Sequence, residues 1–351
     1  ERAVRQGLLV EDARGFAFAH DMFREAFAAG VGTTRAATLH RDAARVLSTR
    51  RPTDPRRVAH HADLGGEPLL AAEALTTAAA LASERYEHAE ALSLLDRAVA
   101  LEVTTDRRLS RARVLLLLGR YDEAQADVDD ALARGAGAAG LEVAALVAYH
   151  ERDLEAALDL ADEAARASTD PELAAGCWCL AGRTLLTLGR LDEALDRLSE
   201  AADLATGPMR AMAAVWRATT LSLRDGGTEA YRLARGATAS SARNDPSVEP
   251  YRALALGRSA TALDRPYEAL LAFAHLAQVV ERQQLVRFLG RADNYRSWVL
   301  RNLGAHEEAA AASGTAWDLV GEVRDLGHAE AHSHAALDLA DAALRAGDLG
   351  T

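Results

Sequence analysis

The sequence of 351 residues is 49% apolar and 5% aromatic, and its formal net charge of −12 argues against direct contact with nucleic acid or with an anionic membrane. All 40 basic residues are arginine, and the absence of lysine excludes a Walker-type phosphate loop and Schiff-base chemistry within this chain. We find neither a signal peptide nor an apolar stretch of membrane-spanning length, so we expect a cytoplasmic protein with no membrane partner.

The first fifty residues do not follow the pattern of the rest of the chain. Leu8–Glu11 and Phe16–Phe18 flank a turn-forming stretch and predict a β-hairpin. An amphipathic pattern then predicts a helix from about Arg35 to Thr49, and a break that contains Pro52 and Pro55 follows it.

From residue 79 onward a pattern of small residues repeats seven times. Each time a small residue is followed twelve positions later by alanine, and in six of the seven copies another alanine comes seven positions further on. The set is Ala79/Ala91/Ala98, Ala112/Ala124/Ala131, Ala145/Ala157/Ala164, Gly182/Ala194/Ala201, Ala218/Ala230/Ala237, Gly257/Ala269/Leu276 and Ser297/Ala309/Ala316. The middle members are 33 to 40 residues apart, which predicts a stacked solenoid of helix pairs. Two helices approach closely only where neither carries a bulky side chain, which explains the small residues.

The clearest copies span Leu115–Leu132 and Leu185–Ala201, where Gly119 and Gly189 are expected to end the first helix of a pair. Acidic residues then open the second helix. This pattern resembles the tetratricopeptide repeat over roughly residues 70 to 320. Aromatic and glycine positions of that repeat match here in or near Tyr121, Trp178, Gly182, Trp298 and Gly304. A polar helix at residues 325–345 is expected to cap the last pair.

The order of the N-terminal motifs carries a second resemblance. A hairpin is followed by HDxxRE (His20–Glu25), by LHRxxAxxL (Leu39–Leu47), by AHHxxxxG (Ala59–Gly66), and then by the repeats. This order is similar to the junction between the winged-helix end of the nucleotide-binding module and the repeat domain in actinobacterial STAND-class regulators, including large LuxR-type and antibiotic-pathway regulators. The resemblance implies an all-α fold of about seven helix pairs plus a cap helix, preceded by a small winged-helix remnant with a β-hairpin. Residues 1–50 would end the winged helix, 51–70 would link, and 71–351 would form the sensor domain.

In a solenoid of helix pairs the first helices line the concave wall, so their residues form one continuous groove. The candidate groove positions are Arg113, Glu142, Tyr149, Cys179, Arg183, Val215, Thr219, Tyr251, Arg258, Asn294, Trp298 and Arg301. Arg113, Arg183 and Arg258 each follow the small packing residue of their repeat. With Arg301 they would offer planar donors for carboxylate or phosphate groups, and the aromatic members would offer stacking faces. Two alternatives stay open: the arginines pair with neighbouring acids, and the aromatic residues pack in the core.

No catalytic or metal-binding constellation stands out in the sequence. Cys177 and Cys179 lie two apart on a predicted helix and point away from each other, so we interpret them as packing residues. His60 and His61 are adjacent and also diverge, which favours a capping or packing role. Among His328, His332 and His334, the i, i+4 pair could hold a metal ion, but an exposed polar face is the favoured alternative.

Two functions fit these observations. In the first, the chain is a sensing and autoinhibitory domain of an ATP-dependent transcriptional regulator, which binds its own nucleotide-binding module and a small-molecule effector or acidic peptide in the groove. In the alternative, it is an interaction scaffold that binds a peptide or partner protein without an allosteric role. Neither function makes this chain an enzyme or gives it a cofactor, because ATP and magnesium would bind an upstream module.

Overall fold

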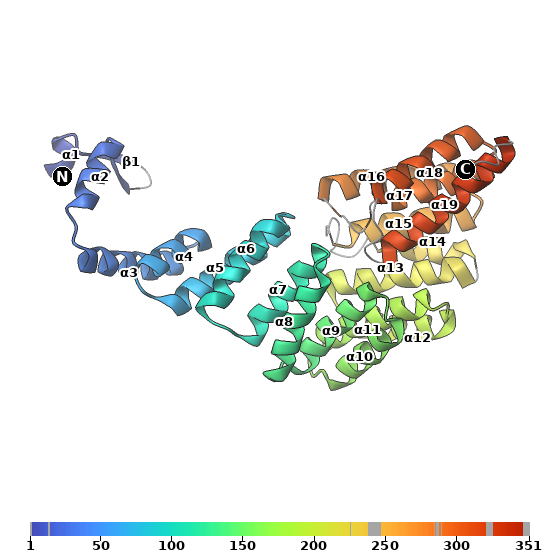
Figure 1. The fold of residues 1–351 in the computed structure, drawn as a ribbon, viewed down its shortest axis with the longest axis horizontal. Coiled ribbons are helices and arrows are strands. Elements are labelled where there is room, and N and C mark those ends of the chain that lie inside the picture. The colour runs from blue at the N-terminus through green and yellow to red at the C-terminus, as the bar shows by residue number, and fades with distance from the viewer. Residues whose placement is uncertain are drawn as a thin grey trace. The chain divides into compact units, whose positions relative to one another are not determined.

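The computed structural model describes residues 2–12, 15–224, 226–237, 247–283, 285, 288, 290–320 and 326–346 (Figure 1). The chain divides into two compact units. The first contains Glu1–Ala82 and Ser93–Val103, and the second contains Ser83–Leu92 and Thr104–Thr351.

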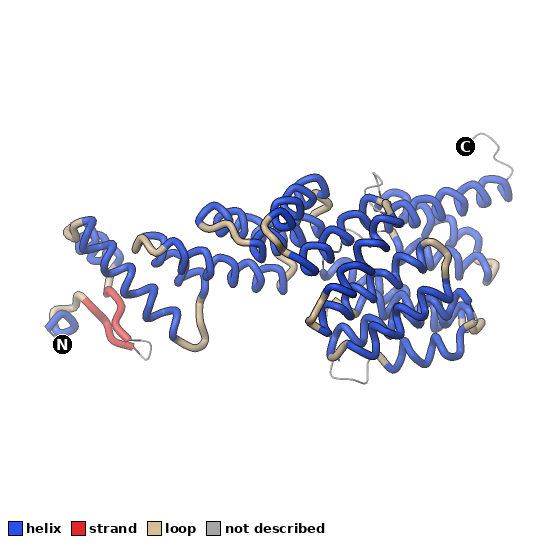
Figure 2. The backbone as a smooth tube through the Cα atoms, turned by 90° about the horizontal axis from the view of Figure 1, so that it is seen from below, coloured by secondary structure: helices blue, strands red, loops and turns tan. Residues whose placement is uncertain are grey.

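The first unit opens with the expected hairpin. After α1 (Arg2–Arg5), strands β1 (Leu9–Asp12) and β2 (Gly15–Phe18) pair antiparallel with Leu9 opposite Phe18, and they are drawn red in Figure 2. The helix α2 (Asp21–Ala29) follows, and the Phe18 and Phe27 rings lie 5.7 Å apart. The hairpin is therefore confirmed, whereas its assignment to a winged helix stays a prediction.

The amphipathic helix predicted from about Arg35 to Thr49 is α3 (Thr33–Thr49). The stretch expected to link two domains is largely helical, because Asp54 accepts a hydrogen bond from the Arg57 backbone N–H and starts α4 (Pro55–Leu64), which packs on α3. Buried Ala44, Ala62 and Ala71 form the core between α3, α4 and the next helix. The limits 1–50, 51–70 and 71–351 stay predictions.

Within the described residues, seven consecutive helix pairs and one last helix make up the repeats, as the alanine pattern predicts. The pairs are α5 (Pro68–Glu84) with α6 (His88–Leu101), α7 (Thr105–Leu117) with α8 (Tyr121–Ala133), α9 (Gly137–Glu151) with α10 (Leu154–Ala167), α11 (Pro171–Thr187) with α12 (Leu191–Leu204), α13 (Gly207–Arg224) with α14 (Gly227–Gly236), α15 (Glu249–Ala262) with α16 (Pro266–Gln283), and α17 (Arg291–Asn302) with α18 (His306–Val320). The last helix is α19 (Leu326–Ala346). From α7 onward the two helices of each pair pack on each other. The first helices from α7 to α15 also contact one another in series, and α17 contacts α16 and α19.

Local sequence signals set the helix ends. Thr104, Asp153 and Asp170 each accept a hydrogen bond from a backbone N–H in the first turn of α7, α10 and α11. Gly119 and Gly189 adopt φ of +71° and +77° just after α7 and α11, a left-handed conformation that favours glycine. The expected ends of these first helices are confirmed.

Every small residue of the repeat pattern is buried. A Cβ atom on Gly182 would lie 2.5 Å from Leu198 Cγ, and one on Gly257 would overlap the Phe273 ring. Where serine takes this place in the last pair, its hydroxyl is buried but satisfied, because Ser297 Oγ and Ser313 Oγ are 2.6 Å apart. The pattern therefore marks the close contacts between helices. In the described part of the chain, no helix is both long and apolar enough to cross a membrane.

Candidate ligand-binding pocket

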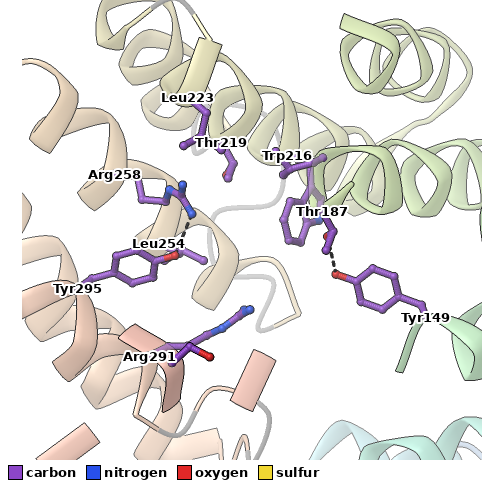
Figure 3. A pocket seen from close by; sticks show the side chains of 11 residues that line it. Tyr149, Thr187, Trp216, Thr219, Leu223, Leu254, Arg258, Arg291 and Tyr295 are labelled. Carbon is purple, nitrogen blue, oxygen red and sulfur yellow. Dashed lines mark hydrogen bonds between the residues drawn. The ribbon is translucent and has the colours of Figure 1, made fainter. Parts of the chain in front are cut away.

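A pocket of about 400 Å³ lies within the second unit, between the first helices of five successive pairs and α19 (Figure 3). Its described lining residues are Tyr149 on α9, Leu186 and Thr187 on α11, Trp216, Thr219 and Leu223 on α13, Leu254 and Arg258 on α15, Arg291 and Tyr295 on α17, and Ser333 on α19. The first helices therefore do line a common concave site, as the repeat pattern predicts.

The lining residues of the first helices share one face. To show this, we number each first helix from the small residue on it that begins the repeat pattern, which is position 0. They occupy positions −6, −3, −2, +1, +4 and +5. At about 100° per residue these positions fall within an arc of about 120° centred on +1. The pocket is thus built from the same helix face in successive repeats.

The helix α19 contributes more than an end cap. It packs on α17 and α18 and also contacts α9, and its Ser333 lines the pocket. The solenoid from α9 to α17 and the helix α19 therefore bound the same space.

Polar groups pair on opposite sides of the pocket, as Figure 3 shows. On one side, Arg258 Nη1 donates to the Tyr295 hydroxyl at 2.8 Å. On the other, the Tyr149 hydroxyl and Thr187 Oγ1 are 3.3 Å apart. Thr219 is buried and donates to the Val215 carbonyl at 3.0 Å. The described lining contains two arginines and no carboxylate, so its formal charge is positive in a chain of net charge −12.

Arg183 lies against two of the lining rings. Its guanidinium carbon is 4.1 Å from the Tyr149 ring centroid and 5.7 Å from that of Trp216. Its Nε and Nη2 atoms are buried and have no hydrogen-bond partner. This side chain does not itself line the pocket, but it occupies position +1, the centre of the lining face.

Two predicted groove residues form an ion pair instead of a free binding surface. Arg113 Nη2 and Glu142 Oε2 are 2.6 Å apart, which is the pairing with a neighbouring acid that the sequence left open. Tyr251 packs against other aromatic rings, which is the alternative that the sequence left open for the aromatic residues. The centroid of its ring lies 5.2 Å from that of Trp216 and 5.0 Å from that of Phe288.

The remaining predicted residues lie away from the pocket lining. Asn294 is buried, Trp298 is 39% exposed, and Arg301 borders a smaller hollow with Asp341 on α19. Cys179 and Val215 are buried in the core. The pocket thus brings together Tyr149, Thr219 and Arg258 from the predicted set, with Arg183 behind two of the lining rings. Their role in binding stays a prediction.

Four of the eight described lining residues that the sequence analysis missed fall in two registers. Trp216 and Tyr295 are at position −2, and Thr187 and Leu223 are at +5. Both registers lie on the same arc as +1, so a helical-wheel count from the small residue would have found them. Ser333 had no such signal, because α19 carries no copy of the repeat.

The cysteines and histidines take structural positions. Cys177 and Cys179 are buried, and burial raises the pKa of both thiols to about 12. His61 packs against His40, with their Nδ1 atoms 2.8 Å apart, and burial is the main cause that lowers the His61 pKa. The side chains of His328, His332 and His334 lie outside the described residues. The described residues contain no group of three or more potential metal ligands.

Comparison with known proteins shows the fold. No protein family and no curated protein matches the sequence. Among solved structures, the APC/C hetero-tetramer Cut9–Hcn1 is similar at 15% identity and a TM-score of 0.61, over 90% of this chain and 57% of that chain. A signal transduction ATPase with numerous domains (STAND) and a tetratricopeptide repeat sensor, from Pyrococcus horikoshii, is similar at 14% identity and a TM-score of 0.60, over 98% of this chain and 55% of that chain.

A third similar structure is the human IFIT1 dimer with PPP-AAAA, at 15% identity and a TM-score of 0.51, over 90% of this chain and 82% of that chain. Together with the seven helix pairs, these likenesses show a tetratricopeptide-repeat-like helical solenoid. The chain spans little more than half the length of the Cut9–Hcn1 and STAND chains.

Proposed function

We propose that this chain is the effector-sensing domain of a larger ATP-dependent regulator, and that the pocket between α9 and α19 is its effector site. The observation that carries this proposal is the origin of the lining, which comes from five successive pairs and from the last helix. A single occupant therefore contacts every repeat from α9 onward. Because neighbouring repeats contact each other in series, such an occupant restrains the curvature of this part of the solenoid.

The proposed regulator is of the STAND class. The order of the N-terminal motifs supports this, as does the similarity in fold to a STAND protein with a repeat sensor over 98% of this chain. In our proposal, an upstream nucleotide-binding module holds ATP and magnesium, the hairpin and α2 are the end of its winged helix, and the repeats hold that module inactive in the cytoplasm. The complete protein would regulate transcription, as LuxR-type antibiotic-pathway regulators do.

Such a domain switches only if its ligand binds the two states with different affinity. To move an equilibrium from 1:99 to 99:1, an effector needs about a 10⁴-fold preference for one state. A pocket whose walls belong to six helices supports such a preference, because a change in curvature moves the walls relative to one another and changes the contacts that the effector makes.

The scaffold alternative predicts an extended acidic peptide in the same groove. The pocket favours the effector, because α19 contributes a wall to it and its volume of about 400 Å³ falls within the range of small-molecule sites. An acidic peptide remains one outcome of the test below.

The test is a thermal-shift screen of the chain against anionic metabolites, sugars, nucleotides and acidic peptides, with each hit checked by calorimetry. A ligand that binds only the folded state raises the melting temperature with concentration. The blocking variant is Thr187→Trp, since Thr187 is exposed and lines the pocket. The matched control is Thr315→Trp on α18, an exposed threonine whose hydroxyl, like that of Thr187, donates to the carbonyl four residues earlier.

We expect Thr187→Trp to abolish the shift and Thr315→Trp to keep it. Hydrogen exchange should then show joint protection of α9 to α19 by the hit. A hit that binds both variants equally would place the site elsewhere and overturn the proposal. A hit confined to acidic peptides would support the scaffold instead.

A further inference from the structure

Arg183 carries a positive charge in the groove wall for which the described residues offer no anion. Its guanidinium carbon lies 4.1 Å from the Tyr149 ring centroid and 5.7 Å from that of Trp216, and its buried Nε and Nη2 atoms have no acceptor. The ring faces offset part of the lost hydration, because a desolvated cation over an aromatic face is attracted by the negative face of the ring. They accept no strong hydrogen bond, so the donor groups of this guanidinium stay unmatched.

The two other arginines at position +1 are matched. Arg113 has Glu142, at 2.6 Å, on the first helix of the next pair. Arg258 donates to Tyr295, also on the next first helix. At the equivalent places after Arg183, the chain has Val215 and Trp216, which offer no side-chain acceptor. The described chain thus supplies a side-chain acceptor for Arg113 and for Arg258 but none for Arg183.

We propose that the missing anion is the carboxylate of the effector and that the effector is a small aromatic monocarboxylic acid. This inference rests on the proposed effector site. Arg183 is half-buried and stands at the centre of the lining face, and both rings that flank it line the pocket. A carboxylate that enters between Tyr149 and Trp216 reaches the part of the guanidinium that remains exposed. Guanidinium and carboxylate are matched in shape and charge, which makes the pair specific for a planar anion.

The rest of the pocket fits an aromatic body. Rings prefer offset or edge-to-face contacts with other rings, and the facing walls offer both rings and aliphatic side chains. The apolar and aromatic members of the lining are Tyr149, Leu186, Trp216, Leu223, Leu254 and Tyr295. The Arg183 guanidinium, which lies over two of the lining rings, matches the single negative charge of a carboxylate.

The unmatched guanidinium should lower the stability of the unliganded protein. Replacement of Arg183 by glutamine removes a charge that lacks a partner, so the melting temperature should stay the same or rise while binding is lost. A structural arginine would behave in the opposite way, because its removal lowers the melting temperature. This difference in sign separates a binding role from a packing role.

The experiment measures four probes by calorimetry on the 351-residue chain: 2-naphthoate, 2-naphthamide, 2-naphthylmethylammonium and acetate. We expect saturable binding of naphthoate, at least about tenfold weaker binding of the neutral amide, and no binding of the ammonium or of acetate, where tenfold is about 1.4 kcal/mol. Equal binding of naphthoate and naphthamide would overturn the carboxylate assignment. Absence of naphthoate binding at millimolar concentration would overturn the aromatic-acid assignment.

Three variants place the carboxylate at Arg183. Arg183→Gln should lose at least about tenfold in naphthoate affinity, and Arg183→Lys should fall between it and the wild type, because lysine keeps the charge and loses the planar donor pair. The control Arg190→Gln removes an exposed arginine at the start of α12 that pairs with Glu193, outside the pocket, and should bind as the wild type does. Unchanged affinity of Arg183→Gln would refute the assignment. The two proposals can fail separately. If naphthoate does not bind but another compound from the thermal-shift screen does, and Thr187→Trp abolishes its binding, the effector site is supported and the aromatic-acid assignment is refuted.

Discussion

Arg113 on α7 and Glu142 on α9 form an ion pair of 2.6 Å that joins the first helices of successive pairs. The same offset recurs along the groove: Arg258 reaches Tyr295, and Arg183 lies 5.7 Å from the Trp216 ring. In these three repeats, the arginine at position +1 thus lies beside position −3 or −2 of the next repeat. Side chains on the concave face are coupled from one repeat to the next, which is the arrangement that a ligand-dependent change in curvature requires.

The ion pair within the α7 and α8 pair should matter far more for stability than Arg113–Glu142. Asp127 is 1% exposed and accepts from Arg108 Nη1 and Arg111 Nε, each at 2.6 Å. Loss of one member of a buried pair leaves charges without compensation and costs about 3–5 kcal/mol. We expect Asp127→Asn to lower the free energy of unfolding by about 3 kcal/mol in urea titrations. The control is Asp129→Asn, an exposed residue two positions on, which should change it by less than about 0.5 kcal/mol. Equal effects of the two variants would contradict the prediction.

The small residues of the repeat should be intolerant of one added methyl group. A Cβ atom on Gly257 would overlap the Phe273 ring, which is fully buried and stacks on Tyr295 at 5.3 Å. Gly257→Ala should therefore destabilise the protein by about 1–3 kcal/mol. Gly314, inside α18, has no atom within 4 Å of the same position, so Gly314→Ala should stabilise by about 0.5–1 kcal/mol through helix propensity. Chemical denaturation of both variants beside the wild type measures the difference, and a stable Gly257→Ala would mean that the pairs repack easily.

The two thiols should report the opening of α11. Cys177 and Cys179 are buried, and burial raises the pKa of each to about 12, so both stay protonated and inaccessible at mildly alkaline pH. We expect Ellman's reagent to label neither cysteine in the folded chain and both in urea. Cys179 lies one helical turn before Arg183, so an effector that binds at Arg183 should slow its labelling further. Fast labelling of the native protein would show that this helix opens readily.

Periodic features were predictable from the sequence because they repeat. The seven pairs follow from small residues at fixed spacing, which mark where helices touch. The helix α4 was missed because residues 51–70 hold a proline-bearing break and no copy of the repeat, so a linker was expected. Asp54 and Pro55 are in fact good helix-starting residues.

The pocket was predictable only in part. Position +1 was identified, but the partners of its arginines depend on which residue the next helix places opposite. Counting to −3 and −2 of the next repeat finds Glu142 for Arg113 and Val215 and Trp216 for Arg183, so this rule would have singled out Arg183. The contribution of α19 to the pocket could not be found by counting repeat positions, because a helix without a copy of the repeat is placed by tertiary packing alone.

The paired replacement Arg183→Gln and Arg258→Gln provides the broadest test of the groove. Arg258 donates to Tyr295 on one side of the pocket, and the Arg183 guanidinium lies over the Tyr149 and Trp216 rings. Both arginines are half-buried on the lining face, so their replacement by glutamine should leave the core intact. We expect helicity by circular dichroism and the melting temperature to stay nearly unchanged, while binding of any anionic hit from the screen is abolished. The control Arg190→Gln and Arg120→Gln removes two exposed arginines from short-range ion pairs outside the pocket and should leave binding intact. A collapse in stability of the first double variant, with no such change in the control, would show that the groove arginines serve the fold and not a ligand.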